Sequence, residues 1–109
     1  MDSSKLMIAF VDELDRWGGE PLYQAILDRL AENDIAGSVA LPGIGAFAGS
    51  RIVEGIESYA RSRPVAVMAV DCEEKLREVL PEIRPMIAGC MMILTDVEVL
   101  AAASPALMT

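Results

Sequence analysis

The segment 35–41, "IAGSVAL", decides the fold, because its first three residues return later in the chain. The tripeptide IAG stands at 35–37 and again at 87–89, each time between a helical pattern and an apolar run typical of a strand. The openings of the two units also match, since one apolar run ends "FVDE" at 10–13 and another ends "AVDC" at 69–72. A strand–helix–strand unit that occurs twice predicts the β-α-β-β-α-β order of the ferredoxin-like fold.

Hydrophobic periodicity places the elements of these two units. Leu22, Ile26 and Leu30 recur at helical spacing and predict an amphipathic helix, with Pro21 suited to its first turn. Pro81 lies within the second helical pattern, where a proline is expected to kink or restart the helix. We expect strands at 5–11, 35–41, 64–70 and 91–100, and helices within 20–34 and 71–89.

The predicted fold class is α+β, with an antiparallel sheet that carries both helices on one face. We expect a single domain over 1–109, built from halves at about 5–41 and 64–100 that the connector 42–63 joins. The other face of so apolar a sheet needs cover, and we expect another subunit to provide it.

Composition favours a cytoplasmic protein with an aliphatic core, since 53% of the residues are apolar and 5% are aromatic. The longest uncharged run, 35–50, is broken by Pro42 and several glycines. A membrane-spanning helix needs about 20 consecutive apolar residues, so we expect no direct membrane insertion. The apolar stretch near the start is shorter than the core of a secretory signal peptide, roughly 7–15 residues.

Charge and residue usage exclude several functions. Seventeen acids against nine bases give a net charge of −8, which disfavours binding to nucleic acid. The chain has no histidine, the commonest general base and metal ligand, so we do not expect an enzyme. Cys72 and Cys90 are interpreted as two small core residues in a reducing compartment.

Acidic residues follow the first and third predicted strands. One hypothesis is a divalent-cation site, because carboxylate oxygens suit such ions. The favoured interpretation is that they are solvated acids of loops and helix starts, with Asp71 capping the second helix and Glu74 completing a capping box. The two groups are Asp12, Glu13 and Asp15, and Asp71, Glu73 and Glu74.

The glycine-rich stretch "LPGIGAFAGSR" at 41–51 is the best candidate for a ligand site. Backbone N–H groups in such loops can approach a phosphate closely. Its length and position between the two units are typical of functional connectors, although a connector without a ligand fits the sequence as well. The candidate ligand-binding residues are Gly43, Gly45, Gly49, Ser50 and Arg51, followed by Arg16, Gly18 and Gly19.

A second interpretation comes from "GIGAFA" at 43–48, which matches the dinucleotide-binding fingerprint G-x-G-x-x-G/A. Asp71 lies 23 residues beyond Ala48, close to the spacing of a ribose contact. A dinucleotide-binding βαβ protein is therefore a remote alternative. The duplicated unit explains more of the chain.

Several of these motifs resemble an uncharacterised PII-like family of the GlnB-like superfamily, domain of unknown function one-ninety. The resemblance rests on "DRWGGEPLYQAI" at 15–26, "IAG" at 35–37, "GIGAF" at 43–47 and the final strand "MMILTDVEVL" at 91–100. It covers about residues 6–100.

The resemblance implies a ferredoxin-like subunit that assembles as a homotrimer and binds an effector in clefts between subunits. ATP, ADP or AMP is the effector class that it suggests. It also implies that the connector docks on a regulated partner, a membrane transporter or an enzyme. The expected function is therefore a PII-like signalling protein, and the alternative is an interaction subunit that docks on its partner without a ligand.

Overall fold

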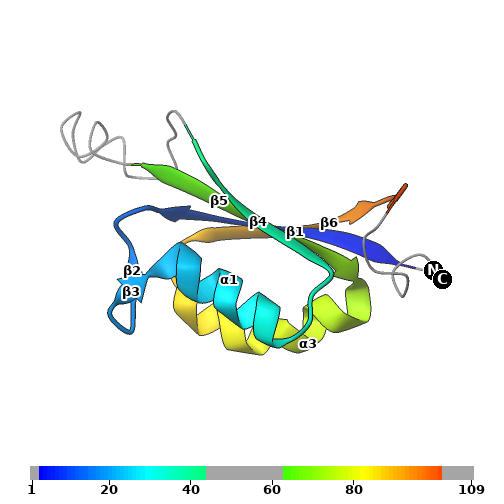
Figure 1. The fold of residues 1–109 in the computed structure, drawn as a ribbon, viewed down its shortest axis with the longest axis horizontal. Helices are drawn as coiled ribbons and strands as arrows, with labels where there is room; N and C mark the ends of the chain where they lie inside the picture. The colour runs from blue at the N-terminus through cyan, green and yellow to red at the C-terminus, as the bar shows by residue number, and fades with distance from the viewer. Residues whose placement is uncertain (1–2, 44–62, 102–109) are drawn as a thin grey trace.

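The computed structural model describes residues 3–43 and 63–101 of the chain. Four strands form an antiparallel sheet in the order β4-β5-β1-β6, so the strand that opens each half lies in the centre. A separate short hairpin follows the first strand (Figure 1). The strands are β1 (Ser4–Asp12), β2 (Arg16–Trp17), β3 (Glu20–Pro21), β4 (Gly37–Pro42), β5 (Pro64–Cys72) and β6 (Met91–Val97).

Two helices cover one face of this sheet, as Figure 1 shows. Helix α1 spans Leu22–Glu32, and helix α3 spans Glu73–Ile83 and continues as the 3₁₀ helix η2, Arg84–Ile87. The order of strands and helices confirms the predicted ferredoxin-like α+β fold. No helix in residues 3–43 and 63–101 is long and apolar enough to cross a bilayer.

Pro81 divides the second helical pattern as expected. It lies inside α3, and the α-helix ends two residues later at Ile83. A proline lacks the N–H that would donate to the preceding turn, and its ring crowds that turn's carbonyl. The chain then tightens into η2, and Gly89, with φ at +88°, turns it toward β6.

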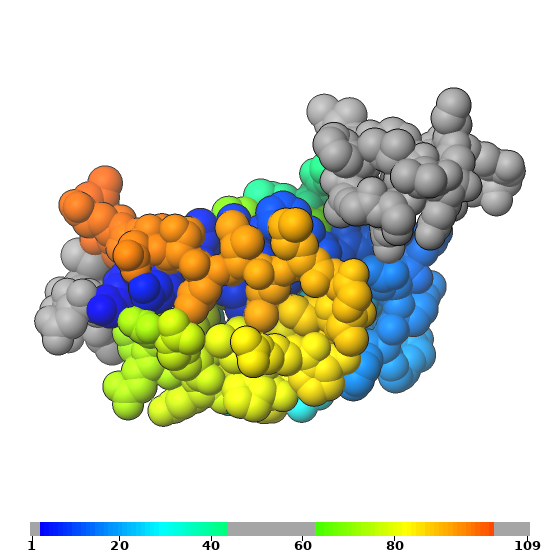
Figure 2. Space-filling model, turned by 180° about the vertical axis from the view of Figure 1, so that it is seen from behind, coloured from blue at the N-terminus to red at the C-terminus, as the bar shows by residue number. Residues whose placement is uncertain are grey.

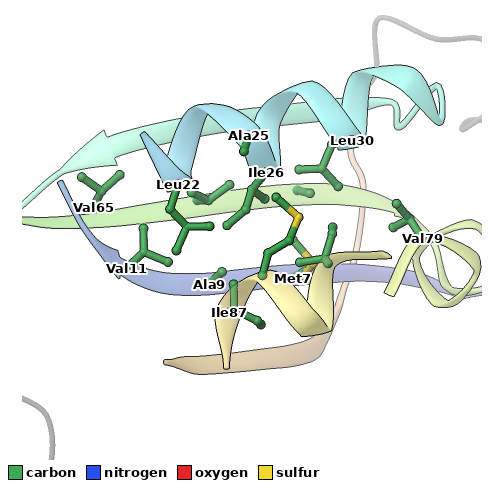
Figure 3. Close-up of a cluster of buried hydrophobic side chains, with 14 of the residues drawn as sticks. Met7, Ala9, Val11, Leu22, Ala25, Ile26, Leu30, Val65, Val79 and Ile87 are labelled. Carbon is green, nitrogen blue, oxygen red and sulfur yellow. The ribbon is translucent and has the colours of Figure 1, made fainter. Parts of the chain in front are cut away.

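The core lies between the helices and the sheet, and alternate residues of the central strands supply it (Figure 3). Successive side chains of a strand point to opposite faces, so every second residue of β1 and β5 faces the helices. The buried apolar residues are Met7, Ala9, Val11, Leu22, Ala25, Ile26, Leu30, Val65, Val67, Ala69, Leu76, Val79, Ile83, Met86 and Ile87.

The opposite face of the sheet, which we call the open face, is apolar and bears no helix from residues 3–43 and 63–101. Strand register sets three rows of neighbouring side chains across it. Phe10, Val39, Leu41, Met91 and Ile93 are each more than 40% exposed there. The rows are Leu41–Ala66–Phe10–Met91, Val39–Met68–Ile8–Ile93 and Gly37–Val70–Leu6–Thr95.

One edge strand and the two cysteines differ from what the sequence predicted. Figure 2 shows β6, in orange, along one edge of the sheet above the yellow helical segment. This strand ends at Val97, earlier than the predicted 91–100. Cys72 and Cys90 are not joined by a disulfide, and both are half-buried rather than fully inside the core. They lie at opposite ends of the sheet, because Cys72 pairs in register with Ser4, whereas Cys90 directly precedes β6, whose Met91 pairs with Phe10.

Candidate functional site

One end of the sheet gathers the segments that carry the candidate site residues. β1 ends there at Asp12 and β4 at Pro42, and β5 begins there at Pro64. Asp12 pairs in register with Pro64, and Pro42 pairs with Val65. The β2–β3 hairpin lies at the same end (Figure 1). We call this region the connector end, because residues 44–62 join β4 to β5 there.

Asp12 is a buried carboxylate at the centre of the connector end, with 5% of the residue exposed. One of its oxygens accepts a hydrogen bond from the Leu14 N–H at 2.8 Å, and the other accepts one from the Arg63 N–H at 3.2 Å. Its own N–H donates to Asp15 Oδ2 at 2.9 Å. A buried carboxylate requires such partners, so Asp12 holds the turn after β1 against the residue that leads into β5. The interpretation of Asp12 as a solvated acid is wrong.

Further contacts join the same segments. The Glu13 N–H donates to the Arg63 carbonyl at 2.7 Å, and the two side chains form an ion pair at 3.7 Å. The Leu22 N–H donates to the Asp15 carbonyl at 2.7 Å, which attaches the start of α1 to the turn. The base of the connector and the start of the first helix are therefore connected through residues 12–15.

The β2–β3 hairpin turns at Gly18 and Gly19, whose φ angles are +59° and +87°. These positive angles match a type I′ turn, which glycine adopts at little cost. The sequence carried this signal, since a Gly-Gly pair between short strands is typical of a hairpin. The register pairs Arg16 with Pro21 and Trp17 with Glu20. Because side chains alternate along a strand, Arg16 lies on one face of the hairpin, and Trp17 and Glu20 lie on the other.

Arg16 is exposed and has no ion pair among the described residues. Of the seven basic side chains in those parts of the chain, five form ion pairs with carboxylates. Arg84, on η2, is the other one without an ion pair there. Arg16 is therefore a basic group at the connector end that is available to an anion.

Gly43 has a structural role in the loop next to β4. Its N–H donates to the Pro64 carbonyl at 2.8 Å, and a Cβ added to it would lie 3.0 Å from Pro64 Cγ. The absence of a side chain allows β4 and β5 to approach closely at this point. The structure thus places Arg16, Gly18, Gly19 and Gly43 at one end of the sheet. The other candidates, Gly45, Gly49, Ser50 and Arg51, lie outside the described residues and stay predictions.

The dinucleotide-binding interpretation is wrong for this fold. Its fingerprint belongs to a βαβ unit, in which the two strands run parallel. Here the strand before the glycines, β4, pairs antiparallel with β5. The strands β4 and β5 therefore do not form the parallel pair of a βαβ unit.

Asp71 lies near the end of β5 in the second half of the fold, as Asp12 lies at the end of β1 in the first half. It is a residue of β5 with 4% exposed, and the N-cap of α3 is Cys72, with no side-chain cap bond. The predicted capping box is therefore wrong. The two oxygens of Asp71 accept hydrogen bonds from the Ala36 N–H at 2.9 Å and the Cys72 N–H at 2.6 Å, and Lys75 Nζ lies 3.3 Å away.

This environment predicts how stability depends on pH. Burial acts to raise the pKa of Asp71, but the Cys72 and Ala36 N–H groups and the Lys75 ammonium outweigh it and hold the pKa below 3.8. A carboxyl whose pKa is lowered by folding stabilises the native state above its unfolded pKa, and that contribution is lost as pH falls through the folded pKa. Urea unfolding from pH 7 to about pH 2 is expected to show wild type losing this advantage over Asp71→Asn below about pH 4. A difference that stays constant over the whole range would contradict the assignment.

The remaining acids do not form a metal site in the described residues. Glu73 lies in the first turn of α3 and pairs with Arg77, and Glu74 is exposed in the same turn, as the favoured interpretation expects. Residues 3–43 and 63–101 contain no group of three or more histidine, cysteine or acidic side chains that could hold a metal ion. Asp12 and Asp71 instead use their oxygens on backbone N–H groups.

Comparison with known sequences identifies relatives along nearly the whole chain. A family model described as "DUF190: Uncharacterized ACR, COG1993" matches residues 4–99. A UPF0166 protein of Aquifex aeolicus (strain VF5) is 30% identical over 98 residues, which cover 88% of this chain and 92% of that protein. A UPF0166 protein of Methanocaldococcus jannaschii is 29% identical over 101 residues, covering 91% and 94% of the two chains.

Comparison with solved structures supports the fold. A crystal structure from Thermus thermophilus, described as a "putative PII-like signaling protein", superposes with a TM-score of 0.59. The match covers 88% of each chain at 14% sequence identity. At this identity the match shows a shared fold, which agrees with the fold expected from the resemblance.

Proposed function

The chain belongs to the DUF190 family and has a PII-like fold, and from this we propose that it is a PII-like regulatory protein. In this proposal it binds a small molecule at the connector end and regulates a partner protein, a membrane transporter or an enzyme, in the cytoplasm. An adenine nucleotide, ATP, ADP or AMP, is the first ligand class to test. We do not propose a catalytic activity.

The observation that carries the proposal is Arg16, which has no ion pair with the described residues and lies on a hairpin attached to the base of the connector. A guanidinium without a carboxylate partner can form charge-assisted hydrogen bonds to a phosphate. Arg16 follows Asp15, which is hydrogen-bonded to Asp12, and Asp12 is bonded to the N–H of Arg63. An anion held by Arg16 would therefore act next to the contacts that position Arg63, where the connector leads into β5.

The open face supports a homotrimer as the working assembly. Its exposed apolar side chains form a continuous patch over four strands, and patches of this kind mark interaction sites. Packing of subunits through this face would bury the patch and bring connector ends near one another. We propose that the ligand binds in the resulting clefts between subunits.

Arg16→Ala is expected to weaken nucleotide binding about tenfold or more, since a hydrogen bond to a charged group contributes about 1.5–3 kcal/mol. The measurement is a thermal-shift panel of ATP, ADP and AMP, with and without Mg²⁺. A ligand at about 100 times its dissociation constant stabilises the native state by about 2.7 kcal/mol, which corresponds to a shift of several degrees.

Arg84→Ala is the matched control, because Arg84 is also exposed and has no ion pair in the described parts of the chain. It is expected to retain the full nucleotide shift. Equal affinity of wild type and Arg16→Ala would remove Arg16 from the ligand site. No shift with any nucleotide in wild type would reject the nucleotide class itself.

A second candidate function is an interaction subunit that docks on its partner without a ligand. The chain carries a net charge of −8, and residues 12–21 contain four acids and one base. The negative electrostatic potential of these acids repels a phosphate and favours the approach of a cationic protein surface. A wild-type protein that ignores every nucleotide in the panel but binds its partner would support this candidate.

A further inference from the structure

The Trp17–Glu20 face of the hairpin is not needed by the proposed ligand site. Trp17 and Glu20 are directly opposed in the β2–β3 register and lie on the side of the hairpin away from Arg16. The indole is 40% exposed, although tryptophan is usually well covered in a folded domain. Glu20 is half-buried and has no ion pair among the described residues.

The segment that contains the hairpin, residues 12–21, carries four acids and a further exposed apolar side chain. Leu14, in the turn that precedes the hairpin, is 65% exposed. Of the four acids in residues 12–21, Asp12 and Asp15 accept backbone hydrogen bonds and Glu13 is paired with Arg63. Glu20 is the one whose carboxylate has neither a hydrogen bond nor an ion pair among the described residues, so it can meet an outside charge. An exposed aromatic ring beside an unpaired carboxylate is a combination suited to a cation with an apolar stem.

We propose that the Trp17–Glu20 face is a docking surface for a lysine- and arginine-bearing segment of a partner protein. The inference rests on the partner regulation proposed above and names the surface and the chemistry of the partner. A guanidinium or ammonium packs on the indole face through a cation–π interaction, and the carboxylate accepts its hydrogen bonds. The net charge of −8 attracts such a segment over a longer range and repels nucleic acid and other acidic partners.

The geometry assigns the two faces of the hairpin to different tasks. Arg16 faces an anion on one side, and Trp17 and Glu20 face a cation on the other. The hairpin is held to the base of the connector through Asp15 and Asp12. A change at the ligand face can therefore alter the docking face without passing through the helices or the core.

The test uses the fluorescence of Trp17, which is the single tryptophan of the chain. The probe is a short peptide of alternating leucine, lysine and arginine without aromatic residues, and the control peptide carries glutamate in place of the bases. Titration of the cationic peptide into the full chain, without nucleotide, is expected to shift the Trp17 emission to shorter wavelength. The acidic peptide is expected to leave the emission unchanged.

Two substitutions with the same change of charge separate docking from general attraction. Glu20→Lys is expected to weaken binding of the cationic peptide at least about tenfold, in the range of a well-placed charge contact. Glu78→Lys, at an exposed position of α3, is expected to weaken it less than about twofold. Glu20→Gln, which keeps the shape of the side chain, is the second variant in case the lysine disturbs the hairpin, and the melting temperature checks folding.

Three results would overturn the inference. They are an equal loss of affinity in Glu20→Lys and Glu78→Lys, binding that leaves the Trp17 emission unchanged, and no binding of the cationic peptide. Because the titration contains no nucleotide, these results are independent of the thermal-shift panel. A failed docking test with a positive panel would leave the ligand site intact, and the reverse would leave the docking surface intact.

Discussion

Phe10→Glu is expected to convert the proposed homotrimer into monomers. Phe10 lies in the middle strand pair of the open face, between Ala66 and Met91, and is 45% exposed in the isolated subunit. If subunits pack through this face, the substitution removes an aromatic contact worth about 1.5–3 kcal/mol and places an unpaired carboxylate in an apolar interface. A loss of at least about 3 kcal/mol per subunit weakens association more than about 100-fold.

Light scattering coupled to size-exclusion chromatography measures this change directly. Wild type is expected to elute with three times the subunit mass of 11.7 kDa, and Phe10→Glu with the subunit mass alone. Gln24→Glu, which adds the same charge at an exposed position of α1, is the matched control and should stay assembled. A Phe10→Glu protein that keeps the wild-type mass would show that the open face is not the subunit interface.

Asp71→Ala is expected to lower the free energy of unfolding by about 2–4 kcal/mol, because it leaves the part-buried N–H groups of Ala36 and Cys72 without their acceptor. The Ala36 bond joins the end of β5 to the turn between α1 and β4, and the Cys72 bond lies at the end of β5 itself, beside the Lys75 ion pair. Lys75 also donates to the carbonyl of Asp34, a residue with φ at +55°. The loss therefore weakens both the start of α3 and the edge strand.

Urea denaturation at pH 7 measures this effect. Asp71→Asn keeps one carbonyl oxygen at the site and is expected to lose less than Asp71→Ala. Asp28→Ala removes an exposed acid of α1 and is expected to change stability by no more than about 0.5 kcal/mol. If Asp71→Ala and Asp28→Ala were equally stable, the Asp71 carboxylate would have no structural role.

The fold could be predicted from the sequence because its hydrophobic pattern is regular and the same strand–helix–strand unit occurs twice. Apolar residues recur at helical spacing along α1 because one side of the helix faces the core, and continuous apolar runs form β1 and β5 at the start of each unit. The repeats at 35–37 and 87–89 then gave the order of the elements, and the order allows few topologies. The duplicated order also predicted that both helices lie on the same face of the sheet.

The candidate site could be predicted from the sequence only in part. The sequence singled out Arg16, Gly18, Gly19 and Gly43 by residue type, and the structure brings them to one end of the sheet. The sequence did not show that the hairpin has two different faces, because that division depends on the Trp17–Glu20 register. It also did not reveal that Gly43 meets Pro64, since the two residues are far apart in the chain and meet only through strand pairing.

The sequence by itself determined the element order, the aliphatic core, the acidic charge and the family, all of which depend on residue type and local spacing. The tertiary structure decided the roles of the two strand-end aspartates. Asp12 and Asp71 look like ordinary loop and cap acids along the chain, and they are buried because their acceptors meet N–H groups from distant segments at Arg63 and Ala36. Whether a carboxylate is exposed to solvent or buried in a hydrogen-bonded site depends on which distant segments pack against it. The neighbouring residues in the sequence do not indicate that contact.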